Sequence, residues 1–226
     1  MLFNLSNFTD PQYLVTILLR IPVVLFSLSF HEAAHAFVAH KMGDDTAKNL
    51  GRLTLNPIKH MDPMGTLAMV LLGIGWAKPV PVMTRNFEHP KKGMILTSAA
   101  GPVSNLILSI IGALLYVPYE IFIGSGNTVT QLIGLLLFIF HYLNLSLAIF
   151  NLIPVPPLDG SRLFLGFLPD HIYFGIMRYE NIIKMVFLGV ILVLNYLGIS
   201  ILSPICSTVS NGMLYIISLP YALLPV

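Results

Sequence analysis

Charged residues are scarce in this chain. Lys and Arg number 12 and Asp and Glu number 10 among 226 residues, so that 10% of the chain is charged, whereas a soluble domain has about 25% charged residues. So few charges cannot cover a water-soluble globule of this size. The 56% hydrophobic content also excludes a disordered chain, because disordered chains are poor in apolar residues. The composition predicts a polytopic membrane protein whose apolar surface contacts the lipid bilayer.

Cysteine and dense basic segments are also lacking. The single cysteine, Cys206, excludes an internal disulfide and a cysteine-based zinc cluster. The net charge is +2, and the basic residues form no dense run, so nucleic acid is not expected as a partner. At this length we expect a single membrane-embedded domain over residues 1–226, without a sizeable soluble appendage.

Long apolar runs, by contrast, occupy most of the chain. A membrane-spanning helix needs about 20 predominantly apolar residues. Four runs are long enough, and a fifth is marginal. They cover approximately residues 13–40, 93–119, 129–150, 182–202 and 213–226. We therefore expect an all-α polytopic fold with about five to six transmembrane helices.

A shorter apolar run, MGTLAMVLLGIGWA (residues 64–77), follows the first long one. It is too short to span a bilayer, so it could re-enter the membrane, form strands or lie at the interface. The flanking segments GRLTLNP (residues 51–57) and KPVPVMTRNF (residues 78–87) have the proline and glycine pattern of short strands and turns. We predict a small re-entrant or β-loop element after the first helix.

The basic residues are distributed unevenly among the connections. Eight of the 12 Lys and Arg residues lie between the first two long apolar runs, and three lie between the third run and the beginning of the fourth, namely Arg162, Arg178 and Lys184. Arg20 is the exception. Cytoplasmic loops carry the excess of Lys and Arg. The distribution therefore predicts a multi-pass protein of the cell membrane, with its N-terminus outside and both basic connections in the cytoplasm.

The first long apolar run contains a motif of metal-binding residues. His31, Glu32 and His35 form H-E-x-x-H, and residues four apart lie on one face of a helix, so both imidazoles can reach one ion. Zinc at catalytic sites keeps one position for water, for which Glu32 can act as general base. A short motif can also occur by chance. However, ionisable residues near mid-membrane are costly and indicate a functional site.

Two histidines leave a zinc ion short of a protein ligand. Candidates for the third ligand are Asp159, His60, Asp62, His141 and His40. Asp159 is the best of these, because the three prolines before it prevent a continuous helix and the glycine after it permits a close turn. An Asp-Gly surface turn is the alternative interpretation of the same residues.

The motifs together resemble those of the site-2 protease family of intramembrane zinc metalloproteases. The resemblance lies in HEAAH (residues 31–35), AAGPVSN (residues 99–105) at the beginning of the next helix, and NLIPVPPLDG (residues 151–160) after the third. It covers a catalytic core of about residues 13–165, to which helices at about residues 182–226 would be added. The chain is similar to a short form of the family, without a PDZ-like or C-terminal regulatory domain.

This resemblance implies roles for five residues. His31, His35 and Asp159 would bind Zn²⁺, and Glu32 would be the catalytic base. Asn151 would be the second catalytic residue, holding the substrate carbonyl or its oxyanion through its amide N–H. The Asn151 amide could instead satisfy the end of its own helix.

The family likeness also implies an activity and a class of partner. We expect an intramembrane endopeptidase that cleaves single-pass membrane-protein substrates within or near their transmembrane segments, with an active site open towards the cytoplasm. Gly101, Asn105 and His141 are expected to pack helices and form hydrogen bonds between them, and His60 to be structural or gating. The alternatives are a different membrane zinc peptidase, or a non-catalytic metal-binding protein acting as a transporter or scaffold.

Overall fold

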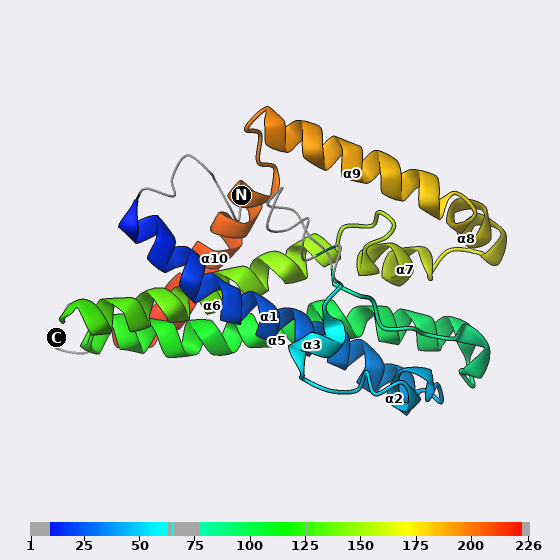
Figure 1. Ribbon diagram of the computed structural model, residues 1–226, viewed down its shortest axis with the longest axis horizontal. Coiled ribbons are helices and arrows are strands. Elements are labelled where there is room, and N and C mark those ends of the chain that lie inside the picture. Colours follow the sequence, from blue (N-terminus) through cyan, green and yellow to red (C-terminus); the bar gives the residue numbers. More distant parts are fainter. Residues whose placement is uncertain (1–9, 63–64, 66–76, 125, 223–226) are drawn as a thin grey trace.

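Four long helices form the body of the protein, described here from a computed structural model (Figure 1). They are α1 (Pro11–Lys41), α5 (Pro90–Phe122), α6 (Thr128–Asn151) and α10 (Leu202–Ser218). The structure describes residues 10–62, 65, 77–124 and 126–222. Helix α5 is central, because it packs against α1, α6 and α10. The remaining elements are arranged around this body.

The described residues contain 4 helices that are long and apolar enough to cross a membrane. They are α1, α5, α6, and α10 together with the short 3-10 turn η3 (Leu219–Tyr221). The prediction of an all-helical, multi-pass protein is therefore confirmed. The predicted count of five to six transmembrane helices is not confirmed.

In the fourth apolar run, residues 182–202, the observed helix is shorter than the run in the sequence. Helix α9 (Glu180–Tyr196) has 17 residues and is about 26 Å long at 1.5 Å per residue, shorter than a hydrocarbon core of about 30 Å. Gly198 then adopts a φ of +70°, in the left-handed region that favours glycine, and the chain turns before α10. Figure 1 shows α9 beside the four-helix body.

Local capping residues determine where α1 and α6 begin. Asp10 precedes α1, and its carboxylate accepts the Gln12 N–H at 2.9 Å. Asn127 precedes α6, and its amide oxygen accepts the N–H groups of Val129 and Thr130. These acceptors satisfy N–H groups that a helix leaves unpaired in its first turn. Both helix starts are therefore encoded locally.

Small and polar residues bring α5 close to its neighbours. Gly101, Asn105, Ser109 and Gly112 are buried and follow one another at helical spacing along α5. A Cβ at Gly112 would lie 2.9 Å from the backbone nitrogen of His141 on α6. Small residues of this kind allow close approach of helices in membranes.

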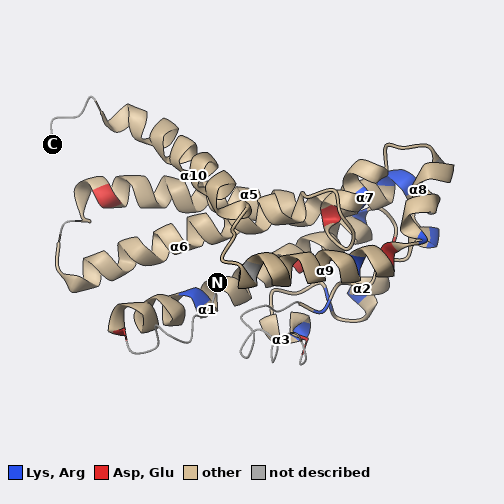
Figure 2. Cartoon of the chain, turned by 90° about the horizontal axis from the view of Figure 1, so that it is seen from above, with Lys and Arg blue, Asp and Glu red and all other residues tan. Residues whose placement is uncertain are grey.

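Charged residues gather at one end of the bundle (Figure 2). This end carries α2 (Thr46–Asn49), α7 (Asp159–Leu165) and α8 (Asp170–Met177), whereas α3 (Pro57–His60) lies nearer the middle of the molecule. Helices α2 and α3 belong to the first basic connection of the sequence, and α7 and α8 belong to the second. The two basic connections therefore lie at the same end of the molecule.

The predicted re-entrant or β-loop element is only partly visible. Of the short apolar run, residues 64 and 66–76 lie outside the described residues. In the described part, Met61 and Ala77 form an isolated antiparallel bridge, and the Lys78 N–H donates to the His60 carbonyl at 2.9 Å. Within the residues that the structure describes, no longer strand is present.

Candidate metal centre

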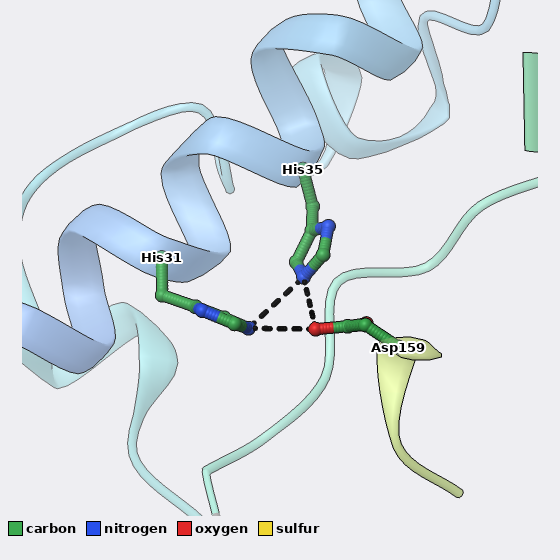
Figure 3. Close-up of side chains that lie close together, drawn as sticks. All are labelled: His31, His35 and Asp159. Atoms are coloured by element: carbon green, nitrogen blue, oxygen red, sulfur yellow. Dashed lines mark hydrogen bonds and ion pairs between the residues drawn. The ribbon is translucent and has the colours of Figure 1, made fainter. Parts of the chain in front are cut away.

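His31 and His35 from α1 meet Asp159 from the first residue of α7 (Figure 3). The two Nε2 atoms are 3.0 Å apart. The Oδ2 atom of Asp159 lies 3.1 Å from Nε2 of His31 and 3.3 Å from Nε2 of His35. The two histidines are buried and Asp159 is half-buried. Two imidazole nitrogens and one carboxylate oxygen thus converge on one point.

The loop between α6 and α7 brings Asp159 to this point. After α6 ends at Asn151, three prolines interrupt helical structure, and the chain folds back before α7. A Cβ at Gly160 would lie 2.3 Å from the carbonyl oxygen of Leu152 and 2.6 Å from that of Ile153. Only glycine fits there without moving the backbone, so the Asp-Gly pair at the beginning of α7 packs tightly against the loop that precedes it.

Helix α5 fixes the orientation of both imidazoles. Nδ1 of His31 is 2.6 Å from Oδ1 of Asn105, and Nδ1 of His35 is 2.7 Å from the Thr97 carbonyl oxygen. Amide and carbonyl oxygens only accept hydrogen bonds, so both Nδ1 atoms donate a proton. Both Nε2 atoms therefore keep a lone pair that faces Asp159.

The residues at this point fit a zinc ion. Oδ2 of Asp159 is buried and has no hydrogen-bond partner, and a buried polar atom without a partner is costly. Gly101 leaves space beside both imidazoles, because a Cβ there would lie within 2.6 Å of their Nε2 atoms. Two histidines and one carboxylate also make a donor set found at catalytic zinc sites. A cation held here would satisfy the carboxylate.

The charge state of Asp159 is consistent with metal binding. Burial by itself would raise the pKa of this carboxyl, but the imidazoles of His31 and His35, when they carry a proton on Nε2, lower its pKa well below the usual range. The side chain is therefore an ionised carboxylate, which is the form that ligates metals.

Glu32 lies beside the histidines and has a partner from a distant part of the chain. Its Oε2 accepts the N–H of Val80 at 2.9 Å. Pro79 and Pro81 flank Val80 and have no N–H to donate. The backbone of this segment therefore reaches the acidic residue of the motif and holds its carboxylate in one orientation.

Two further contacts hold residues 78–83 in place. Nη2 of Arg52 donates to the Lys78 carbonyl at 2.6 Å. The Met83 N–H donates to Oδ2 of Asp44 at 2.7 Å. The segment is thus fastened on both sides of its contact with Glu32.

Asp44 is a buried carboxylate just beyond the end of α1. Besides Met83, it accepts hydrogen bonds from the backbone and hydroxyl of Thr46 and from the Asn86 amide. Burial by itself would raise the pKa of Asp44, but these hydrogen bonds outweigh it and lower the pKa from its ordinary value. Asp44 ties the segment that reaches Glu32 to the end of α1.

Asn151 is the last residue of α6 and does not contact the three converging side chains. Its Nδ2 donates to the Leu147 carbonyl at 3.0 Å, within its own helix. No hydrogen bond joins Asn151 to His31, His35 or Asp159, all of which the structure describes.

The other candidate ligands lie elsewhere. His60 is buried, with Nε2 2.8 Å from the Thr54 carbonyl oxygen, and His40 pairs with Asp45. His141 is buried, and its two ring nitrogens lie beside the hydroxyls of Ser109 and Ser210. In the described part of the chain, His31, His35 and Asp159 form the group that could hold a metal ion.

Three contacts of the site were missed by the sequence analysis. They involve the Thr97 carbonyl, the Val80 N–H and the Asp44 carboxylate. Two of these groups belong to the backbone, so no residue type could have revealed them. Asp44 stands in a pair of aspartates directly after α1, which resembles any exposed turn.

Comparisons with known proteins give a consistent result. The model of the family described as peptidase family M50 matches residues 117–194. The "Putative zinc metalloprotease YwhC" of Bacillus subtilis (strain 168) is 43% identical over 197 residues, which cover 86% of this chain and 89% of that protein. The "Putative zinc metalloprotease Rip2" of Mycolicibacterium smegmatis is 30% identical over 158 residues, covering 66% of this chain and 57% of that protein. No solved structure gives a significant match.

Proposed function

We propose that this chain, which belongs to peptidase family M50, the family of site-2 proteases, cleaves peptide bonds within or near the transmembrane segments of other membrane proteins. It is an intramembrane zinc metalloprotease, and its apolar helices are those of a multi-pass membrane protein. The observation that carries the proposal is the convergence of His31, His35 and Asp159 next to Glu32.

His31, His35 and Asp159 are the zinc ligands in this proposal. Their support is the 3.0–3.3 Å spacing of the three ligand atoms, the unpartnered oxygen of Asp159 and the two imidazoles oriented from α5. Three protein ligands leave one position for water, as at other catalytic zinc sites.

Glu32 is the general base. Zinc, when bound, acidifies a water molecule and polarises the scissile carbonyl. Glu32 accepts the proton that the water molecule loses. The oxygen of the water molecule attacks the carbonyl carbon at the same time. Glu32 then donates this proton to the amine nitrogen as the C–N bond breaks, which regenerates the base. The hydrogen bond from Val80 holds the carboxylate in position for both transfers.

Asn151 is the second catalytic residue of the proposal. Its amide N–H would donate to the negative oxygen that develops on the scissile carbonyl. This requires Nδ2 to release the Leu147 carbonyl when substrate arrives. Catalytic hydrogen bonds are often formed only in the substrate complex.

The substrates that we propose are single-pass membrane proteins of the cell membrane, which reach an active site open towards the cytoplasm. The charged end of the bundle (Figure 2) supports a cytoplasmic location of both basic connections and an external N-terminus. We further propose one protease domain over residues 1–226, with a catalytic core at about residues 13–165. A total of five to six membrane segments requires α9 or residues 64–77 to enter the bilayer as well.

The central test separates metal binding from catalysis. Glu32→Gln removes the base but keeps the side chain's size, so the purified protein should retain zinc and lose cleavage of a reporter with a transmembrane segment. Glu120→Gln is the matched control, because Glu120 is an exposed glutamate at the far end of α5 and should leave both properties unchanged. Cleavage by Glu32→Gln at the rate of the unaltered protein would refute the mechanism.

A further inference from the structure

A series of buried hydrogen bonds leads from His31 to two other helices. Oδ1 of Asn105 on α5 lies 2.6 Å from Nδ1 of His31. Nδ2 of Asn105 donates to Oδ1 of Asn144 on α6 at 2.9 Å, and Nδ2 of Asn144 donates to the Phe140 carbonyl at 2.8 Å. The side chains of Asn105 and Asn144 are fully buried.

The Asn144 contact determines which way the Asn105 amide points. The Asn105 amide nitrogen faces two acceptors, Oδ1 of Asn144 and, at 3.4 Å, the Ser27 carbonyl. A flipped amide would place its oxygen against these two acceptors, so that neither of them would receive a hydrogen bond. Unpaired buried polar groups are costly. The observed orientation is therefore the only one that satisfies every partner.

This orientation in turn determines which nitrogen of His31 is free. With the Asn105 oxygen accepting from Nδ1, the lone pair of His31 is on Nε2, which faces Asp159. His35 is held differently, because its Nδ1 donates to the Thr97 backbone carbonyl, an acceptor that no side-chain substitution removes. The orientation of His31 therefore depends on a side chain, and that of His35 does not.

We propose that Asn105 is a positioning residue for His31, held in its functional orientation by Asn144, so that the affinity for zinc depends on this pair of buried amides. The inference rests on the ligand set proposed above. Groups that orient metal-bound histidines typically contribute 10–100-fold to metal affinity or activity. A purely structural role, in which the two amides only join α5 to α6, would affect stability alone.

The test measures zinc affinity of the full-length protein in detergent, by competition with a chelator. Asn105→Ala should weaken zinc binding about 10–100-fold and change the absorption spectrum of the cobalt-substituted protein, which reports ligand geometry. Asn105→Asp should restore part of both properties, because a carboxylate can accept the Nδ1 proton of a zinc-bound histidine but has no N–H for Asn144 and Ser27. Asn144→Ala should give a smaller loss, because Asn105 then keeps its contact with His31 but can rotate.

Ser109→Ala is the matched control. Ser109 is also on α5, is fully buried and contacts α6 through Nδ1 of His141 at 3.0 Å, but it has no link to the zinc ligands. The control should lower thermal stability without changing zinc affinity or the cobalt spectrum. An equal loss of zinc affinity in Ser109→Ala and Asn105→Ala would overturn the proposal, because the effect would then arise from helix packing.

His31→Ala separates this inference from the proposed ligand set. If His31→Ala loses zinc while Asn105→Ala binds it normally with an unchanged cobalt spectrum, the positioning role is wrong and the ligand set stands. If His31→Ala keeps zinc, the ligand set itself is wrong and the inference fails with it. Should Asn105→Ala not fold, as judged by its helical circular dichroism, Asn105→Asp and Asn144→Ala decide by the same affinity and spectral criteria.

Discussion

Buried polar groups of two kinds occur within the same helical bundle. His141 has partners for both ring nitrogens, with Nδ1 3.0 Å from the Ser109 hydroxyl and Nε2 2.9 Å from that of Ser210. His31 and His35 have outside partners for Nδ1 only, and their Nε2 atoms face each other. Both ring nitrogens of His141 therefore have hydrogen-bond partners within the protein, whereas Nε2 of His31 and Nε2 of His35 do not.

The carboxylates of Asp44 and Asp159 differ in the same way. Asp44 accepts hydrogen bonds with both carboxylate oxygens, whereas Oδ2 of Asp159 has no hydrogen-bond partner. Burial of a polar group is costly unless the protein supplies its partners. The protein supplies them around Asp44 and His141, and lacks them where Asp159 meets His31 and His35. This difference distinguishes the structural polar residues from the proposed metal site.

The largest effect is expected from a substitution that removes the carboxylate of Asp159. Asp159→Ala should abolish stoichiometric zinc binding and proteolysis, because two imidazoles alone are a weak site for zinc. Asp44→Asn, the matched change at the carboxylate whose partners are complete, should retain zinc. Elemental analysis of the purified proteins measures both results. Unchanged zinc content in Asp159→Ala would contradict the assignment of Asp159 as a ligand.

Two glycines on α5 allow the same methyl group to be added either beside His31 and His35 or beside His141. A Cβ at Gly101 would lie 2.5 Å from Nε2 of His35, whereas a Cβ at Gly112 would lie 2.9 Å from the backbone nitrogen of His141. Gly101→Ala should therefore lower zinc affinity about 10–100-fold by displacing the imidazoles. Gly112→Ala should cost about 1–3 kcal/mol of stability through overpacking and leave zinc affinity intact.

Chelator competition and thermal unfolding of both glycine variants decide between these effects. If Gly112→Ala weakened zinc binding as strongly as Gly101→Ala, the proposed difference between the surroundings of His141 and those of His31 and His35 would be wrong. The proposed difference would also be wrong if Gly101→Ala changed only the thermal stability.

Asp44 provides a prediction that depends on pH. Its pKa is lower in the folded protein than the value of about 3.9 in an unfolded chain. The ionised carboxylate therefore contributes stability that is fully present above about pH 3.9 and is lost as the pH falls through the folded-state pKa. Asp44→Asn does not titrate at this position, so it should lose about 1–3 kcal/mol locally at pH 7 and resemble the unaltered protein in acid.

Hydrogen exchange at the Met83 N–H reports this effect, because that group donates to Asp44. Faster exchange in Asp44→Asn at neutral pH, with the difference disappearing in acid, is the expected outcome. A difference that persists unchanged below the folded-state pKa would mean that the charge of Asp44 is not responsible.

The smallest effect is expected from Ser210→Ala, in the group formed by Ser109, His141 and Ser210, where both ring nitrogens of His141 have partners. This variant removes the partner of Nε2 of His141, and side-chain hydrogen bonds between membrane helices average about 0.6 kcal/mol. The free energy of unfolding in detergent should fall by about that amount, with unchanged zinc content. Loss of zinc from Ser210→Ala would show that the two clusters are coupled.

Much of the architecture was predictable from local sequence patterns. The scarcity of charge indicates a membrane protein, and the apolar runs at residues 13–40, 93–119 and 129–150 correspond closely to α1, α5 and α6. The run at residues 182–202 corresponds to the 17-residue helix α9 followed by a left-handed turn at Gly198, and its span of the membrane stays a prediction. Hydrophobicity alone does not show where such a turn interrupts a helix.

The spacing of His31 and His35 is enough to place them on one face of a helix, because residues four apart are neighbours on any α-helix. Their surroundings, in contrast, follow from the packing of distant segments. Asn105 is 74 residues from His31, Thr97 is 62 residues from His35, and Val80 is 48 residues from Glu32. These partners come from other helices and from backbone groups, so they depend on how α5 and residues 78–83 pack against α1. Local periodicity determines which face a side chain occupies, but packing between distant segments determines which of its polar atoms remains unsatisfied.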